Sequence, residues 1–485
     1  MPTTTIDYRQ FLARLDPLWN PLVHRGGRYV EANPASTRRD WGEAALLGNG
    51  MVGAAIYKKT AEALTWELGR NDAEAHNHLR GIDWSVPRIP LGDLRLEPVG
   101  EILRESMRLS LHDAEASGEI RTRQGRILWT SFADAVRDVL VVTVRCEGEE
   151  TAARMRLVPA HGVSPRVAWT NAANASPLPP QPMTTKVNGT ELAVQELIGQ
   201  DGAVSGECAL AMRCIERDAA TRVYLVGIDH SRENGLARQR VLDTVSQAAT
   251  DGFEALLAEH RDWWHAYYPA SFLSLPDTRW EAFYWIQMYK LASATRGTMR
   301  EAIDNQGPWL TETSWPGTWW NLNVQLSYSP LYTANRMELA ESLVRAIDGN
   351  RERMRENAAS ISADGMYMGR ASGRLCEGNR MPASETILAG NLPLFELGNF
   401  TWIVQLLHRH YRCTMDRAFL KEKVYPVLRA NLNVYLKLLR RWEDGPPSTP
   451  TRNWASATPA PPTIPATTSP SSAGDCKPCS KPMRN

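Results

Sequence analysis

Residues 309–336 carry the side chains of this sequence that are best suited to bind a hydroxylated ligand. They include four tryptophans, Trp309, Trp315, Trp319 and Trp320, and three polar residues, Glu312, Asn321 and Asn323. Pro316 and Gly317 interrupt the stretch and predict a loop. Indole rings with N–H donors suit a pocket for a molecule that is half apolar and half hydroxylated, as a sugar is. A tryptophan-rich core patch between two helices is the alternative.

Within this loop we expect the substrate contacts to come from Trp315, Trp319, Trp320 and Glu312. Beyond it, apolar residues recur at helical spacing from Leu322 to Ile347, with a kink or a restart expected at Pro330. Asn321 and Asn323 would lie at the mouth of this helix, where short amides cap backbone groups or hold a ligand or a water. Capping explains a single asparagine, whereas two asparagines directly after paired tryptophans favour a site.

Residues 319–330, Trp-Trp-Asn-Leu-Asn-Val-Gln-Leu-Ser-Tyr-Ser-Pro, resemble the H-x-N-x-N-L-Q-x-N-Y-W-P segment of glycoside hydrolase family 95. This family contains inverting α-L-fucosidases and α-L-galactosidases. The resemblance implies that Asn321 and Asn323 help a carboxylate to position the attacking water. The sequence departs from the pattern at Trp319, where the family usually has histidine, and at Ser327 and Ser329. These departures bear on the preferred sugar.

Two further segments resemble the same family. The LGNG and ELGRND segments around residues 47–72 resemble its N-terminal β-domain, and residues 260–296 resemble its linker and first barrel helix. Gly48, Gly50 and Gly53 also match G-x-G-x-x-G. A strand-like run follows them where a dinucleotide fingerprint needs a helix, which argues against nucleotide binding.

The order of the patterns predicts a multidomain β + α protein. Short apolar runs between turn residues predict an N-terminal β-sandwich, a super-sandwich by the resemblance, over residues 1–232. A helical linker is expected over 233–275. Sustained helical periodicity over 276–445, with helices near 330–358, 396–414 and 416–442, fits a partial (α/α)6 barrel of the six-hairpin glycosidase type.

The amino-acid composition argues against two classes of binding partner. The 55 basic and 54 acidic residues leave a net charge of +1 without a basic stripe, so neither nucleic acid nor a membrane surface is an expected partner. No apolar segment predicts a membrane span or a signal peptide, so we expect a cytoplasmic protein as written, although the family's members are often exported. The seven scattered cysteines predict no disulfide framework.

No cofactor or metal is expected. The histidine pairs His76 with His78 and His408 with His410 lack a nearby third ligand in the sequence, and i, i+2 spacing directs helical side chains to different faces. Cys476 and Cys479 form a single C-x-x-C without a second pair, which predicts neither a metal site nor a redox site.

Residues 446–485 contain 10 prolines and 12 serines or threonines, too few apolar residues for a core, and we expect them to be disordered. They could be a natural extension. We favour a frameshift, because in the shifted frame residues 447–455 and 466–475 can encode segments that resemble the family's H-S-P-E and Y-D-L-x-L-L-R-W segments. By the resemblance, the family's general acid lies in the H-S-P-E segment and its general base lies further along the chain. The chain as translated contains neither the acid nor the base.

The resemblance therefore implies inverting hydrolysis of α-L-fucosyl- or α-L-galactosyl-type linkages in an oligosaccharide or polysaccharide, and an inactive chain as translated. Of the carboxylates in the predicted barrel loops, Glu312, Glu385 and Glu396, none matches the family's acid. A glycan-binding pseudoenzyme and an inverting phosphorylase of the related barrel type are the alternatives. The sequence does not specify the sugar, the linkage or the oligomeric state.

Overall fold

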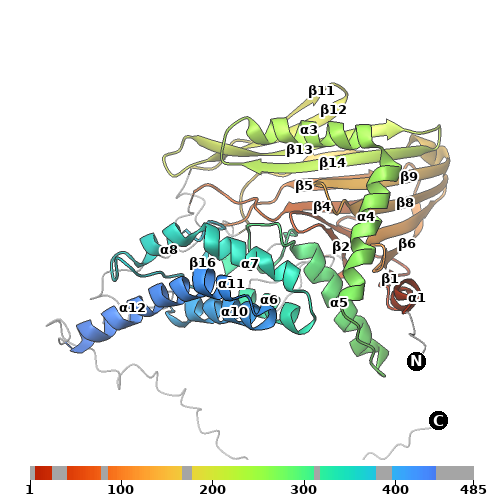
Figure 1. Cartoon of the computed structure of the whole chain (residues 1–485). Helices are drawn as coiled ribbons and strands as arrows, with labels where there is room; N and C mark the ends of the chain where they lie inside the picture. The colour runs from red at the N-terminus through yellow and green to blue at the C-terminus, as the bar shows by residue number, and fades with distance from the viewer. Residues whose placement is uncertain are drawn as a thin grey trace, which may run out of the picture.

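The computed structural model describes residues 6–24, 41–77, 86–165, 177–310, 317–377 and 396–443 (Figure 1). The predictions for Glu312, Trp315, Glu385, His78 and residues 446–485 fall outside these ranges. In the described residues, no helix is both long enough and apolar enough to cross a membrane.

Two antiparallel sheets form the N-terminal part of the chain. The larger sheet has nine strands in the order β1-β6-β7-β8-β9-β14-β13-β12-β11, and the smaller has five in the order β10-β5-β4-β3-β2. The strands are β1 (Leu18–Trp19), β2 (Ala45–Gly48), β3 (Val52–Tyr57), β4 (Leu64–Arg70), β5 (Gly92–Glu97), β6 (Ile102–Ser110), β7 (Glu115–Thr122), β8 (Gly125–Ala133), β9 (Val139–Gly148), β10 (Arg154–Pro159), β11 (Met183–Val187), β12 (Thr190–Ile198), β13 (Val204–Glu216) and β14 (Thr221–Ser231).

The two sheets pack face to face around aromatic side chains. Trp66 of β4 meets Trp129 of β8 edge to face, with ring centroids 5.2 Å apart. The indole nitrogen of Trp66 also donates a hydrogen bond of 3.1 Å to Ser131 Oγ. Large apolar side chains contributed alternately by both sheets are what a sandwich requires. The prediction of large antiparallel β structure followed by a helical region is confirmed.

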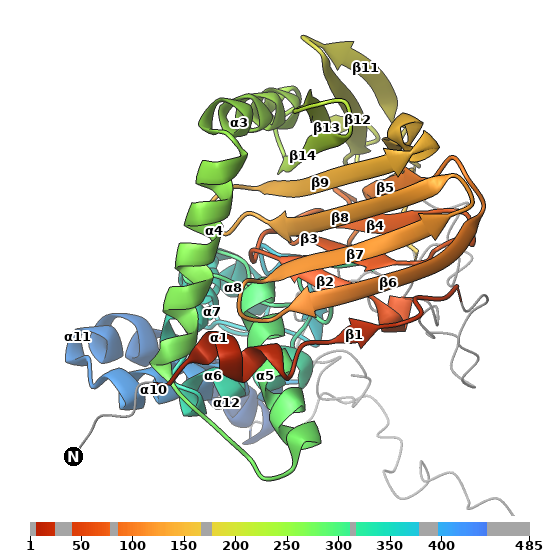
Figure 2. The same ribbon diagram turned by 90° about the vertical axis from the view of Figure 1, so that its right-hand side faces the viewer.

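Two helices lie against the larger sheet. Helix α3 (Leu236–Asp251) covers its outer face, where Val241 and Val245 join a buried cluster with Val223 and Leu225 of β14. Helix α4 (Phe253–Tyr267) then runs past the ends of β9, β8 and β7 toward the helical region (Figure 2). The N-terminal helix α1 (Tyr8–Ala13) lies beside α5 in the same view. Helix α4 therefore joins the end of the larger sheet that carries α3 to the helical region (Figure 2).

The helical region follows the linker. Its elements are α5 (Thr278–Ala294), β15 (Thr318–Trp319), α6 (Asn323–Thr333), α7 (Met337–Gly349), α8 (Arg351–Ala358), β16 (Ala371–Ser372), α10 (Gly398–Thr414), α11 (Arg417–Phe419), a π-helical turn over Leu420–Val424, and α12 (Tyr425–Glu443). The restart predicted at Pro330 falls further along, because α6 includes Pro330 and ends before Asn335, whose φ is 54°. A left-handed residue ends a helix more firmly than a proline in its last turn.

The smaller sheet lies between the larger sheet and the helical region (Figure 1), and glycines on it permit close contact. A Cβ atom at Gly69 of β4 would lie 2.0 Å from the carbonyl oxygen of Pro308. A Cβ atom at Gly53 of β3 would lie 2.8 Å from the Trp309 indole nitrogen. Both positions therefore need glycine for close packing, and one of them, Gly53, belongs to the G-x-G-x-x-G match.

Arg88 fastens the segment after α5 to this sheet. Its side chain is buried and pairs with Asp304, also buried, at 2.9 Å. The same guanidinium donates to the carbonyl oxygens of Gly307 and of Arg70 at the end of β4. A buried guanidinium is tolerated when a carboxylate and backbone carbonyls satisfy its donors. This one side chain thus connects the sandwich to the segment that leads into the tryptophan-rich residues 309–336, which we call the aromatic loop.

Substitution of Gly69 by alanine tests this packing. The new methyl group would press on the Pro308 carbonyl, which is backbone and cannot turn aside, so we expect Gly69→Ala to lower the free energy of unfolding by about 1–3 kcal/mol or more. Urea unfolding measures the change. Gly349→Ala at the end of α7 is the matched control, because no atom lies within 4 Å of its new Cβ. Equal stability of both variants would contradict the close packing.

Candidate active site

The two short strands β15 and β16 bring the predicted site residues Trp319, Trp320 and Asn321 to one place. Trp319 pairs with Ala371, and Thr318 pairs with Ser372. Immediately beyond β15, the backbone N–H groups of Trp320 and Asn321 both donate to the carbonyl oxygen of Arg370, at 2.7 and 3.2 Å. Leu322 then takes a φ of 86°, which turns the chain into α6 at Asn323. The strand pair therefore fixes the backbone of residues 318–323.

A carboxylate that is 75 residues away in sequence meets Asn321. The Asn321 amide nitrogen Nδ2 donates to Glu396 Oε2. Asn399 Nδ2 donates to the same oxygen at 2.9 Å, and Arg370 forms an ion pair with Oε1. Glu396 is about one-third exposed, so the cluster borders solvent. The structure thus joins Asn321 to a carboxylate whose two oxygens are both held.

Buried groups surround this cluster. Gln325 of α6 donates through Nε2 to the carbonyl oxygens of Trp320 and Asn399, which ties α6 to α10 behind the site. Burial, together with the negative charge of Glu396, holds the pKa of the Tyr367 hydroxyl above its usual range. Tyr367 therefore stays protonated at neutral pH.

The four tryptophans fall into two groups. Trp309 and Trp320 are 5% and 1% exposed, and their indole nitrogens donate to the Leu47 carbonyl oxygen at 2.7 Å and to Ser372 Oγ at 2.8 Å. The core-patch alternative therefore describes these two residues. Trp319 is only partly buried. Trp315 and Glu312 lie outside the described residues.

Asn323 and the remaining candidates take different positions. Asn323 begins α6, and its carbonyl oxygen accepts a hydrogen bond of 3.0 Å from Ser327 Oγ. His410 is buried and pairs with Glu341 at 3.0 Å, whereas His408 is exposed on the same helix. The two histidines thus point to different environments, as their spacing predicted. His76 contacts His230 through their Nε2 atoms, which are 2.9 Å apart.

Arg370, Glu396 and Asn399 are the site residues that sequence reasoning missed in whole or in part. Glu396 was considered as a loop carboxylate, but no pattern linked it to Asn321. Arg370 precedes a two-residue strand, and Asn399 lies in the first turn of α10. Neither position has a motif or a spacing that would distinguish it from other polar residues.

The site also connects back to the sandwich through the end of β16. Arg374 donates from its guanidinium to Asn71 Oδ1 and from its backbone N–H to Glu74 Oε2, the latter at 3.1 Å. Arg232 bridges Glu74 at 2.6 Å and Glu377 at 3.1 Å. Burial, reinforced by the charge of Glu377, raises the pKa of Glu74 to about 7. This contact therefore depends on protonation near neutral pH.

Comparisons with known proteins give a family match over the helical region and a solved structure with the same fold. Residues 277–456 match the model of the glycosyl hydrolase family 95 catalytic domain. No curated protein sequence gives a match. Among solved structures, a protein assigned as a kojibiose phosphorylase from the human microbiome shares the fold, with a TM-score of 0.53, 11% identity and coverage of 86% of this chain and 70% of that one. A bacterial glucoamylase complexed with acarbose gives a TM-score of 0.38, 8% identity and coverage of 87% and 70%.

Replacing Glu74 by glutamine should change how stability depends on pH. Because the folded pKa of about 7 exceeds the ordinary value of 4.5, the folded protein holds this proton more tightly than the unfolded chain. The resulting stabilisation is complete below pH 4.5 and is lost as the pH rises through 7. Glutamine keeps the uncharged form at every pH, so Glu74→Gln should gain stability relative to the wild type between pH 5 and pH 8. Parallel unfolding profiles of the two proteins would contradict the raised pKa.

Proposed function

We propose that this chain, whose residues 277–456 match the glycosyl hydrolase family 95 catalytic domain, binds an α-L-fucosyl- or α-L-galactosyl-type sugar of an oligosaccharide or polysaccharide beside Trp319 and Asn321. The complete site of such a domain would hydrolyse the linkage with inversion. The observation that carries the proposal is the hydrogen bond from Asn321 to the held carboxylate of Glu396.

This hydrogen bond fixes which way the Asn321 amide faces. An ionised carboxylate accepts hydrogen bonds but cannot donate them, so Glu396 selects the nitrogen end of the amide. The oxygen end, Oδ1, then faces away from Glu396 and can accept a hydrogen bond from a water or a sugar hydroxyl. Holding a water by such an acceptor is the role that the family resemblance gives to Asn321 and Asn323.

Glu396 serves as a positioning residue in this proposal and not as the general acid. Arg370 and the amides of Asn321 and Asn399 already engage both of its oxygens. An inverting glycosidase needs one carboxylic acid to protonate the leaving oxygen and a second carboxylate to activate water. The H-S-P-E segment that would carry the acid is absent from the sequence as translated. We therefore propose that the 485-residue chain binds its sugar without turnover.

One surface feature supports an incomplete barrel. Leu432, Leu436 and Leu439 of α12 are 44%, 51% and 60% exposed, and their spacing places them on one side of the helix. An apolar stripe of this kind normally packs against another helix. It fits our proposal that residues 446–485 are an out-of-frame product in place of further barrel helices, with the family match ending inside this tail at residue 456.

Two other functions remain candidates. A glycan-binding pseudoenzyme would use the same contacts and would lack the acid and the base in any reading frame. An inverting phosphorylase of the related barrel type is suggested by the fold shared with the protein assigned as a kojibiose phosphorylase, although a shared fold does not determine the reaction.

Assays on aryl α-L-fucoside and aryl α-L-galactoside, each with and without phosphate, separate these functions. We expect binding without turnover by the 485-residue chain, and hydrolysis in plain buffer once the frame after codon 446 is restored. Turnover only in the presence of phosphate would favour the phosphorylase. A frame-restored protein that binds sugar but never hydrolyses it would favour the pseudoenzyme. Robust hydrolysis by the 485-residue chain would contradict the missing acid and base.

Calorimetry on two site variants tests the position of the sugar. Trp319→Ala removes a stacking surface and Asn321→Ala removes a hydrogen-bond acceptor, so each should weaken binding by on the order of 1 kcal/mol or more. Trp280→Ala is the matched control, because Trp280 is a 63% exposed tryptophan on α5, outside the strand pair. Unchanged affinity in both folded site variants would move the sugar elsewhere.

A further inference from the structure

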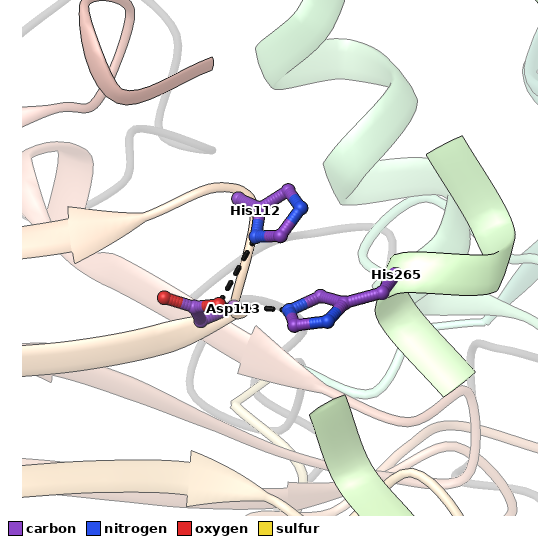
Figure 3. A group of neighbouring side chains, drawn as sticks. All are labelled: His112, Asp113 and His265. Atoms are coloured by element: carbon purple, nitrogen blue, oxygen red, sulfur yellow. Dashed lines mark hydrogen bonds and ion pairs between the residues drawn. The ribbon is translucent and has the colours of Figure 1, made fainter. Parts of the chain in front are cut away.

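Three side chains converge where the sandwich meets the linker helix, away from the strand pair β15 and β16. His265 Nε2 lies 2.8 Å from Asp113 Oδ1, and His112 Nδ1 lies 3.1 Å from the same oxygen (Figure 3). The two imidazole rings are stacked, with centroids 4.0 Å apart. One donor atom from each residue lies within 4.8 Å of the others.

Elements that are distant in sequence hold this cluster in place. His112 and Asp113 lie in the turn between β6 and β7, where Ala114 takes a φ of 53°, and His265 lies in the last turn of α4. Around them, His260 of α4 contacts the Asp113 carbonyl oxygen through Nε2 at 2.9 Å, and Arg261 pairs with Glu115 at 2.6 Å. The turn and the helix are therefore already fixed together, so the three side chains need little further ordering to act as a unit.

The spacing of the donor atoms suits a tetrahedral ion. Ligands bound to zinc at about 2.0–2.2 Å lie roughly 3.4 Å apart. The two imidazole nitrogens lie 2.8 and 3.1 Å from Asp113 Oδ1, close to this value, and all three donor atoms lie within 4.8 Å of one another. Small side-chain rotations would therefore admit an ion between the three residues. Two imidazoles and one carboxylate are a ligand set that favours zinc and related divalent metals over calcium or magnesium.

A cavity opens onto the cluster, and the two arginines near it already pair with other carboxylates. His112, Asp113 and Glu115 line a cavity of about 260 Å³ that also contacts Arg9 of α1 and Arg108 of β6. Arg108 is paired with Asp16 at 2.5 Å, and Arg261 is paired with Glu115, so neither guanidinium needs Asp113 as its partner. The cavity offers an entry path and space for a water as the fourth ligand.

We propose that His112, Asp113 and His265 bind one divalent transition-metal ion, Zn²⁺ in the first instance, which cross-links the β6–β7 turn to α4. Each histidine would coordinate through the nitrogen that now faces Asp113, with its proton carried on the other ring nitrogen. This site departs from the absence of metal expected from sequence, which considered only histidines close together in the chain.

Zinc titration of the full 485-residue chain, freed of metal by chelator and dialysis, tests this proposal. Isothermal calorimetry should give one Zn²⁺ per chain, and zinc should raise the melting temperature. His265→Gln and Asp113→Asn keep the size of the side chains, and each should weaken zinc affinity at least about tenfold. His408→Gln is the matched control, because His408 is exposed on α10.

A second control removes the two C-terminal thiols, which could bind zinc themselves, in the double variant Cys476→Ser/Cys479→Ser. This double variant should retain full zinc binding, and cobalt bound to it should show d–d bands without a thiolate charge-transfer band. Three results would overturn the proposal: no saturable zinc binding by the wild type, unchanged affinity in both His265→Gln and Asp113→Asn, or loss of the bound zinc in the cysteine variant.

Discussion

The buried guanidinium of Arg88 is the interaction on which the arrangement of the two halves depends. It connects the end of β4 to Asp304 and Gly307, and so fixes the segment between α5 and the aromatic loop on the smaller sheet. A buried charge must be paired in one defined geometry, because removing one partner typically costs about 3–5 kcal/mol. The guanidinium therefore sets the position of this segment on the sheet, together with the hydrogen bond from the Trp309 indole nitrogen to the Leu47 carbonyl oxygen.

Two other sets of contacts fix the backbone on either side of the strand pair β15 and β16. The glycines of β3 and β4 let Pro308 and Trp309 lie directly on the sheet, and Arg374 ties the end of β16 to Asn71 and Glu74 of the sandwich. The strand pair β15 and β16 is too short to be stable alone. It persists because both of its flanks are fixed, and it then presents Trp319 and Asn321 beside Glu396. The sandwich thus acts as the support of the proposed sugar site.

How much the sequence could predict follows from the range of each interaction. Alternating apolar runs and helical periodicity are local, so they predicted large antiparallel β structure followed by helices. The motif around Asn321 is local too, and the match of residues 277–456 supports the family it suggested. The partners of Asn321 are not local, since Arg370, Glu396 and Asn399 reach it only through the fold. The burial of Trp309 and Trp320 likewise depends on Leu47 and Ser372, which no spacing in the sequence connects to them.

The proposed sugar site rests on a fixed backbone at β15 and on the carboxylate of Glu396 that orients the Asn321 amide. The most direct measurement is a crystal structure of the 485-residue chain soaked with an α-L-fucoside or α-L-galactoside. We expect a sugar ring next to Trp319, with a hydroxyl or a bridging water hydrogen-bonded to Asn321 Oδ1 and with the Asn321–Glu396 hydrogen bond intact. A sugar bound elsewhere on the molecule, or an Asn321 amide turned with its oxygen toward Glu396, would contradict it.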